Sequence, residues 1–127
     1  MIPKFRAYCK SDKTIYEVLL IDFKAKIEQI KLRKTSNIWY DFEDVVLMQS
    51  TGLYDRHGVE IFQGDVVKIV YDGEPFIGVV VYDLGETDFK ATNNHEDYGN
   101  NFQYLTVGES IEVIGNVWEN EDLLNDR

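Results

Sequence analysis

The chain has 127 residues, of which 44% are hydrophobic and 28% charged, and its formal net charge is −10. This length fits one domain, and this composition is typical of a folded globular protein rather than a disordered one. No stretch approaches the run of about 20 apolar residues that a membrane-spanning helix needs, and the N-terminus lacks the apolar core of a signal peptide. We therefore expect a single domain over residues 1–127 that lies in the cytoplasm and has no membrane partner.

The charge is unevenly divided along the chain. Residues 1–40 hold nine Lys and Arg against four Asp and Glu, whereas residues 41–127 hold four against nineteen. Two parts of opposite sign could attract each other within one chain or between copies, or the basic part could contact an anionic partner. Attraction within or between chains comes first, because phosphate binding usually goes with a domain that is basic overall.

A β-hairpin is predicted at the start of the chain. Phe5, Ala7 and Cys9 alternate with more polar residues, residues 11–13 are turn formers, and a second strand is expected over 14–21. Cys9 is the only cysteine, and its place in this alternation predicts a buried free thiol, which implies a reducing compartment. The next segment, 23–32, fits either a short helix or a strand that changes face, and we favour the strand.

The remainder of the chain predicts short strands separated by turns. A continuous apolar run over 45–48 is typical of a central strand buried on both faces. Asp55 to Gly58 fits a hairpin loop with Gly58 at positive φ, and Gln63 to Asp65 fits a second turn around Gly64.

Asp72-Gly73 is a strong hairpin signal, and it separates two long apolar strands. Gly78, inside the second of these, is expected at a bend or bulge. Asn120 and the acidic residues after it predict a short C-terminal helix. So many short strands and so little helix favour a small barrel or sandwich. The predicted strands in this part cover residues 66–71, 76–82, 88–92, 102–107 and 111–117, with a polar loop at 93–101.

Residues 47–67, with the sequence LMQSTGLYDRHGVEIFQGDVV, resemble the central pattern of the YopX family: Gln, Thr-Gly, Asp, Gly, Glu-Ile and Gly-Asp in that order. Flanking segments at 4–7, 111–116, 119–120 and 123–124 are similar to further family signatures, so the resemblance spans nearly the whole chain. It implies a bacteriophage or prophage origin and a bacterial host cell. It also implies a mainly β (β-rich α+β) fold.

The fold expected from this resemblance and the strand pattern has two subdomains. An N-terminal β-hairpin region, residues 1–45, is expected to pack on an SH3-like small β-barrel, residues 46–127, which ends in the short helix. The resemblance implies no activity, because the family has no assigned catalytic or binding residues to carry over.

Residues suited to metal binding or nucleophilic catalysis are few. Cys9, His57 and His95 stand at no ligand spacing from one another, and a catalytic triad would need proximity that nothing in the sequence predicts. His95-Glu96-Asp97 is expected to be a solvated loop segment. We therefore expect no enzyme activity, no cofactor and no metal site.

Basic and aromatic residues gather near the N-terminus. Small β-barrels often bind nucleic acid with such residues when they share one face, but the acidic remainder of this chain would repel phosphate. The leading hypothesis is a non-enzymatic macromolecular-interaction module with a protein partner, forming a homo-oligomer whose basic N-terminal region contacts an acidic surface. The alternative is a nucleic-acid-binding module that uses the basic and aromatic N-terminal strands. The candidate partner-binding residues are Arg6, Lys31, Arg33 and Trp39, and Tyr8, Lys10, Lys34 and Tyr40 could add to them.

Overall fold

The fold is mainly β, as the sequence predicts. The computed structural model describes residues 4–24, 30–34, 38–93, 102–106, 108 and 110–120. In these residues eleven strands form two open sheets with antiparallel pairing, a six-stranded sheet in the order β4-β3-β2-β1-β5-β6 and a five-stranded sheet in the order β10-β9-β8-β7-β11. The described residues contain no helix with the length and hydrophobicity that a membrane span requires.

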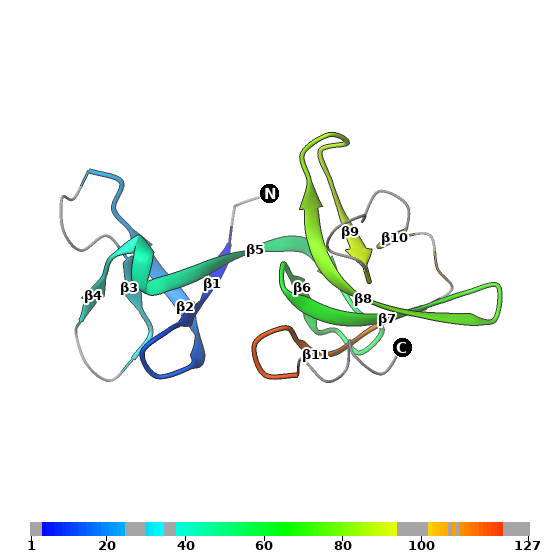
Figure 1. Ribbon diagram of the computed structural model, residues 1–127, viewed down its shortest axis with the longest axis horizontal. Coiled ribbons are helices and arrows are strands. Elements are labelled where there is room, and N and C mark those ends of the chain that lie inside the picture. The colour runs from blue at the N-terminus through cyan, green and yellow to red at the C-terminus, as the bar shows by residue number, and fades with distance from the viewer. Residues whose placement is uncertain are drawn as a thin grey trace. The chain divides into compact units, whose positions relative to one another are not determined.

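The chain divides into two compact units, Met1–Ser50 and Thr51–Arg127, and the boundary falls inside strand β5. We call them the N-terminal unit and the C-terminal unit and describe each by itself. Figure 1 gives the order of the strands along the chain by colour.

The N-terminal unit is built on the predicted hairpin. Strands β1 and β2 pair around a turn at residues 11–13, and the other edge of β1 pairs with β5. Strand β5 is an interior strand, between β1 and β6, but it is not buried on both faces along its whole length, because Val46 and Leu47 are only half-buried. The elements are β1 (Phe5–Cys9), β2 (Thr14–Ile21), β3 (Ile30–Leu32), β4 (Trp39–Tyr40), a 3-10 helix (Phe42–Asp44) and β5 (Val45–Tyr54).

One face of this sheet carries the core of the unit. Alternate residues of β1 and β3 are fully buried there, because successive side chains of a strand point to opposite faces. The buried thiol of Cys9 is confirmed. Of the predicted strand at 23–32, only Ile30–Leu32 is a strand, and residues 25–29 lie outside the described residues. The core consists of Ala7, Cys9, Ile30, Leu32 and Val45, with Tyr16, Val18, Tyr40 and Leu47 packed against it.

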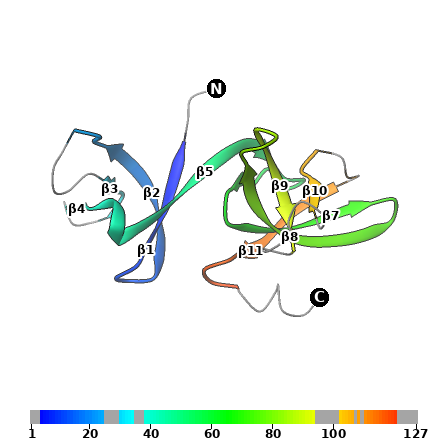
Figure 2. The same cartoon turned by 45° about the horizontal axis from the view of Figure 1, so that its top comes forward.

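The C-terminal unit holds the remaining strands, with the β7–β8 hairpin as a long arm and β11 beside β7 (Figure 2). Its main core combines Ile61 from β6, at the edge of one sheet, with side chains from the other sheet: Val67, Ile69, Val80, Ala91 and, next to β10, Leu105. The strands are β6 (Glu60–Phe62), β7 (Asp65–Tyr71), β8 (Glu74–Asp83), β9 (Asp88–Thr92), β10 (Phe102–Tyr104) and β11 (Ser110–Asn116).

The predicted turns are confirmed. Gly58 and Gly64 have φ values of +81° and +86°, in the region that side chains other than glycine rarely adopt. Asp72 and Gly73, which join β7 to β8, also have positive φ, as a two-residue type I′ turn requires.

Other details differ from the predictions. No bulge occurs at Gly78, since the β7–β8 register runs through the Val67–Gly78 pair without a shift. The glycine is needed because a Cβ there would lie 2.9 Å from backbone atoms of Thr92. Strand β10 ends at Tyr104, short of the predicted residue 107. Apart from Asn93, the polar loop predicted over 93–101 lies outside the described residues. The predicted helix beyond Asn120 also lies outside them.

Candidate functional site

The four residues predicted as partner contacts lie on one face of the N-terminal sheet. Arg6 is opposite Glu17 on β2, and it alternates with the buried Ala7, so its side chain is on the face away from the core. Lys31 alternates with two buried neighbours on β3 and is opposite Trp39 on β4. We call this surface the outer face, and its residues are Arg6, Tyr8, Ile15, Glu17, Leu20, Lys31, Arg33 and Trp39.

The outer face mixes positive charge with exposed apolar area. Leu20 is opposite Lys31 and is 53% exposed. The Arg33 Nε donates to Glu17 Oε2 at 2.7 Å, but both side chains are at least half exposed, and ion pairs of this kind contribute little to stability. An incoming carboxylate could therefore compete for Arg33 at small cost.

Lys34 and Tyr40 do not join the outer face. The Lys34 ammonium donates to the Tyr40 hydroxyl at 2.6 Å and to Asp12 Oδ2 at 3.1 Å, and it lies 4.9 Å from the ring centroid of Tyr16. The hydrogen bonds that Lys34 donates to Tyr40 and Asp12 raise the pKa of Lys34, and the hydrogen bond from the Tyr16 hydroxyl is the main cause that lowers the pKa of Asp12. This cluster holds the β1–β2 turn to β4.

Asp55, in the segment that resembles the YopX pattern, joins a turn to a distant strand. Its Oδ1 accepts the backbone N–H groups of His57 and Val59, both at 2.8 Å, and its Oδ2 accepts that of Val113 on β11 at 3.0 Å. Burial raises the pKa of Asp55, but these three N–H groups outweigh it and lower the pKa overall. The next residue, Arg56, donates its N–H to the carbonyl of Ile111 at 3.0 Å.

Other polar residues of this segment have similar structural roles. The Thr51 hydroxyl donates to the Ile61 carbonyl at 2.8 Å and accepts the Leu53 N–H, and the buried Asp65 Oδ2 accepts the Phe62 N–H at 2.8 Å. His57 lies in the turn with Nε2 3.9 Å from Glu112 Oε1, while His95 lies outside the described residues. The pattern therefore secures the fold of the C-terminal unit.

A buried lysine, which no sequence signal marked, fixes the β8–β9 hairpin. Lys90 is only 2% exposed; its ammonium donates to Asp83 Oδ2 at 2.6 Å and to Glu86, and it lies 4.1 Å from the ring centroid of Phe102. The Tyr104 hydroxyl donates to Glu86 Oε2 at 3.0 Å. Asp83 and Glu86 raise the pKa of Lys90, and the Lys90 ammonium lowers the pKa of both carboxyl groups.

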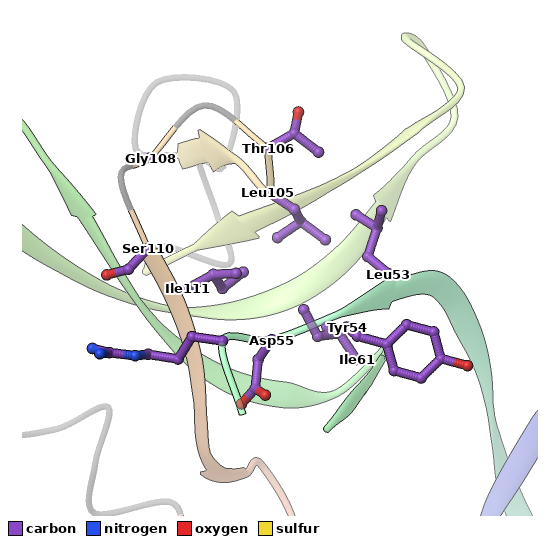
Figure 3. A pocket seen from close by; sticks show the side chains of 10 residues that line it. Leu53, Tyr54, Asp55, Ile61, Leu105, Thr106, Gly108, Ser110 and Ile111 are labelled. Carbon is purple, nitrogen blue, oxygen red and sulfur yellow. The ribbon is translucent and has the colours of Figure 1, made fainter. Parts of the chain in front are cut away.

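An open pocket of about 390 Å³ lies in the C-terminal unit. Figure 3 shows Leu53, Ile61, Leu105 and Ile111 around it, with the ring of Tyr54 directed away. Arg56 also lines the pocket, and its guanidinium makes no hydrogen bond or ion pair with any described residue. The pocket thus combines an apolar lining with a positive charge that is available to a ligand.

Comparison with known proteins identifies the family. The family model described as YopX protein matches residues 4–125. The chain belongs to the YopX family. Protein EF1440 from Enterococcus faecalis is similar in structure, with a TM-score of 0.61 and 24% identity, over 98% of this chain and 99% of the other.

A second solved YopX-family structure, protein yopX from Bacillus subtilis, has a TM-score of 0.60 and 21% identity, over 94% of this chain and 96% of the other. At these identities the likeness is one of fold. No curated protein matches the chain.

Proposed function

We propose that this YopX-family chain is a non-enzymatic, phage- or prophage-encoded interaction module that works in the cytoplasm of a bacterial host. Its outer face binds an acidic protein surface. The observation that carries the proposal is the convergence on one sheet face of Arg6 from β1, Lys31 from β3, Arg33 directly after β3, and Trp39 from β4. Aromatic and arginine side chains are enriched where proteins bind one another.

The partner that fits the charges of this chain is a second copy. Residues 1–50 hold nine basic and seven acidic residues, whereas residues 51–127 hold four and sixteen. The N-terminal unit is therefore slightly positive and the C-terminal unit strongly negative. Contact between the outer face of one copy and the acidic unit of another would pair the two signs.

Sedimentation velocity of the wild type and of the double variant Lys31→Glu/Arg33→Glu tests this. The wild type should associate more tightly in about 0.05 M salt than in about 0.5 M through the outer face, because exposed charges are screened within a few ångströms at the higher salt. The double variant should lack the additional association that low salt gives the wild type. Lys13→Glu, in the β1–β2 turn, is the matched control and should behave like the wild type. Association of equal strength in the wild type and the double variant, at both salt concentrations, would refute the proposal.

Single-stranded nucleic acid is the second candidate partner. Tyr8 and Trp39 lie on the same face as Arg6 and Lys31, and aromatic rings beside cations are the arrangement on which unpaired bases stack. Fluorescence anisotropy with a labelled single-stranded oligonucleotide at low salt should then show binding that Trp39→Ala weakens and that falls steeply with salt. Unchanged anisotropy at low salt would remove this candidate.

We also propose that the C-terminal unit is an SH3-like barrel. Its support is the shared core, in which Ile61 of one sheet packs with Val67 and Val80 of the other, as in the interior of a small, partly open barrel.

A further inference from the structure

An apolar side chain projects from a rigid loop of the C-terminal unit. Leu84 is 81% exposed and directly follows β8 in the turn between β8 and β9. Figure 1 labels the two strands of this hairpin. A single exposed apolar residue is ordinary on a protein surface, and Leu84 is distinguished by the loop that holds it and by the charges around it. Leu84 does not line the pocket of its own chain.

The loop that carries Leu84 is tightly fixed. Lys90 binds the carboxylates of Asp83 and Glu86 on either side of it, and the Gly85 N–H donates to Asp83 Oδ1 at 2.8 Å. Thr87 has a φ of +52°, which a β-branched residue adopts only where the surroundings impose it. A loop fixed in this way loses little conformational entropy when its tip is bound.

The charges of this loop complement the pocket. Asp83, Glu86 and Asp88 surround Leu84, and Lys90 compensates only one of these negative charges. The lining of the pocket includes Asp55 as well as Arg56, but both carboxylate oxygens of Asp55 accept backbone N–H groups, so the Arg56 guanidinium is the charge available beside the apolar side chains. Phe23 is comparably exposed, at 80%, but the opposite charges of Asp22 and Lys24 on either side of it cancel, so its surroundings do not complement Arg56.

We propose that the pocket formed by Leu53, Ile61, Leu105, Ile111 and Arg56 is the docking site for the Leu84 loop of a second copy. Leu84 enters the apolar part, and the acidic loop faces Arg56. The pocket volume, about 390 Å³, lies within the range of about 300–1,000 Å³ in which proteins hold ligands. The Leu84 loop and the pocket are different surfaces of the chain, so the contact is head-to-tail. Such a contact extends to further copies unless it closes into a ring.

This contact is independent of the outer face, and salt distinguishes the two. Each copy carries a net charge of −10, so added salt screens the repulsion between copies. Association through Leu84 should persist or strengthen in about 0.5 M salt, under conditions that dissolve a contact between the outer face and an acidic surface.

The test uses two variants. Leu84→Ser removes the apolar side chain that enters the pocket, and Leu53→Ser replaces an apolar side chain of the pocket lining. In about 0.5 M salt the wild type should show a mass by light scattering that rises with concentration. The dissociation constant should rise at least about tenfold in either variant. An equimolar mixture should recover a dimer, because each variant keeps the half that the other has lost.

Tyr71→Ser, at another exposed residue, is the control and should associate like the wild type. Arg56→Glu serves as the pocket variant if Leu53→Ser fails to fold, as judged by its melting curve. A monomeric wild type, an unaffected Leu84→Ser variant or a mixture that stays monomeric would each overturn the proposal. A foreign peptide that occupies the pocket of a monomeric wild type would overturn the second copy as its occupant.

Discussion

Replacing Asp55 should destabilise the C-terminal unit more than any other single carboxylate change in the YopX-like segment. Its two oxygens accept three backbone N–H groups, from His57, Val59 and Val113. Asp55→Asn keeps one oxygen for the first two, but its NH₂ group must then face the Val113 N–H, donor against donor. Asp55→Ala removes all three acceptors.

The magnitudes follow from the hydrogen bonds. A hydrogen bond to a charged group contributes about 1.5–3 kcal/mol, and an unsatisfied buried donor costs about 1–3 kcal/mol. We expect a loss of about 2 kcal/mol in the free energy of unfolding for Asp55→Asn and about 4 kcal/mol for Asp55→Ala. Against a typical total of about 5–15 kcal/mol, the second loss leaves a marginal fold.

Urea unfolding followed by circular dichroism measures both losses. Asp72→Asn is the control, because Asn tolerates the positive φ of Asp72 and should change stability by less than about 0.5 kcal/mol. In the folded protein the pKa of Asp55 lies below its ordinary value of 3.8. The ionised carboxylate therefore adds its full contribution to the free energy of unfolding above pH 3.8, and this contribution is lost as the pH falls through the lowered pKa. The difference in the free energy of unfolding between the wild type and Asp55→Ala should therefore become smaller in acid. Equal unfolding midpoints for the wild type and both variants at neutral pH would refute this role.

Three further substitutions test other parts of the structure, each by its unfolding midpoint. Gly78→Ala should cost about 1–3 kcal/mol, since the new Cβ meets the Thr92 backbone, and a neutral result would contradict the close approach. Gly58→Val should cost more than Gly58→Asn, because only the backbone conformation is strained there and Asn tolerates it; equal effects would argue against strain. Lys90→Met should lower the melting temperature at neutral pH and less in acid, where Asp83 and Glu86 take up protons and lose the benefit of the lysine; a deficit independent of pH would refute the charged pairing.

Local patterns in the sequence predicted much of the fold. The alternation around Ala7 and Cys9, and the Asp72-Gly73 turn, depend on neighbours along the chain and were sufficient to predict their hairpins. At Gly78 the local sequence predicts a bend or bulge, whereas the real constraint, the Thr92 backbone, comes from a strand pairing that one sequence does not reveal.

The sites depend more strongly on contacts between distant residues. Whether Arg6, Lys31 and Trp39 share a face depends on the register of four strands, including a shift between Val18 and Leu20. The bond from Val113 to Asp55 joins residues 58 positions apart. Lys90 was missed because a lysine in a short strand is normally solvated, and its burial requires Asp83 and Glu86 from the preceding turn.

Amide hydrogen exchange tests the central claim, that the outer face is the binding surface, most directly. Exchange would be compared at protein concentrations below and above association, in about 0.05 M salt, for the wild type and the Lys31→Glu/Arg33→Glu variant. The account predicts that association slows exchange in peptides from β2, β3 and β4 of the wild type and leaves exchange in the same peptides of the variant unchanged. Slowing confined to residues 53–56 and 84–87 would place association at the pocket instead, and would contradict the claim for the outer face.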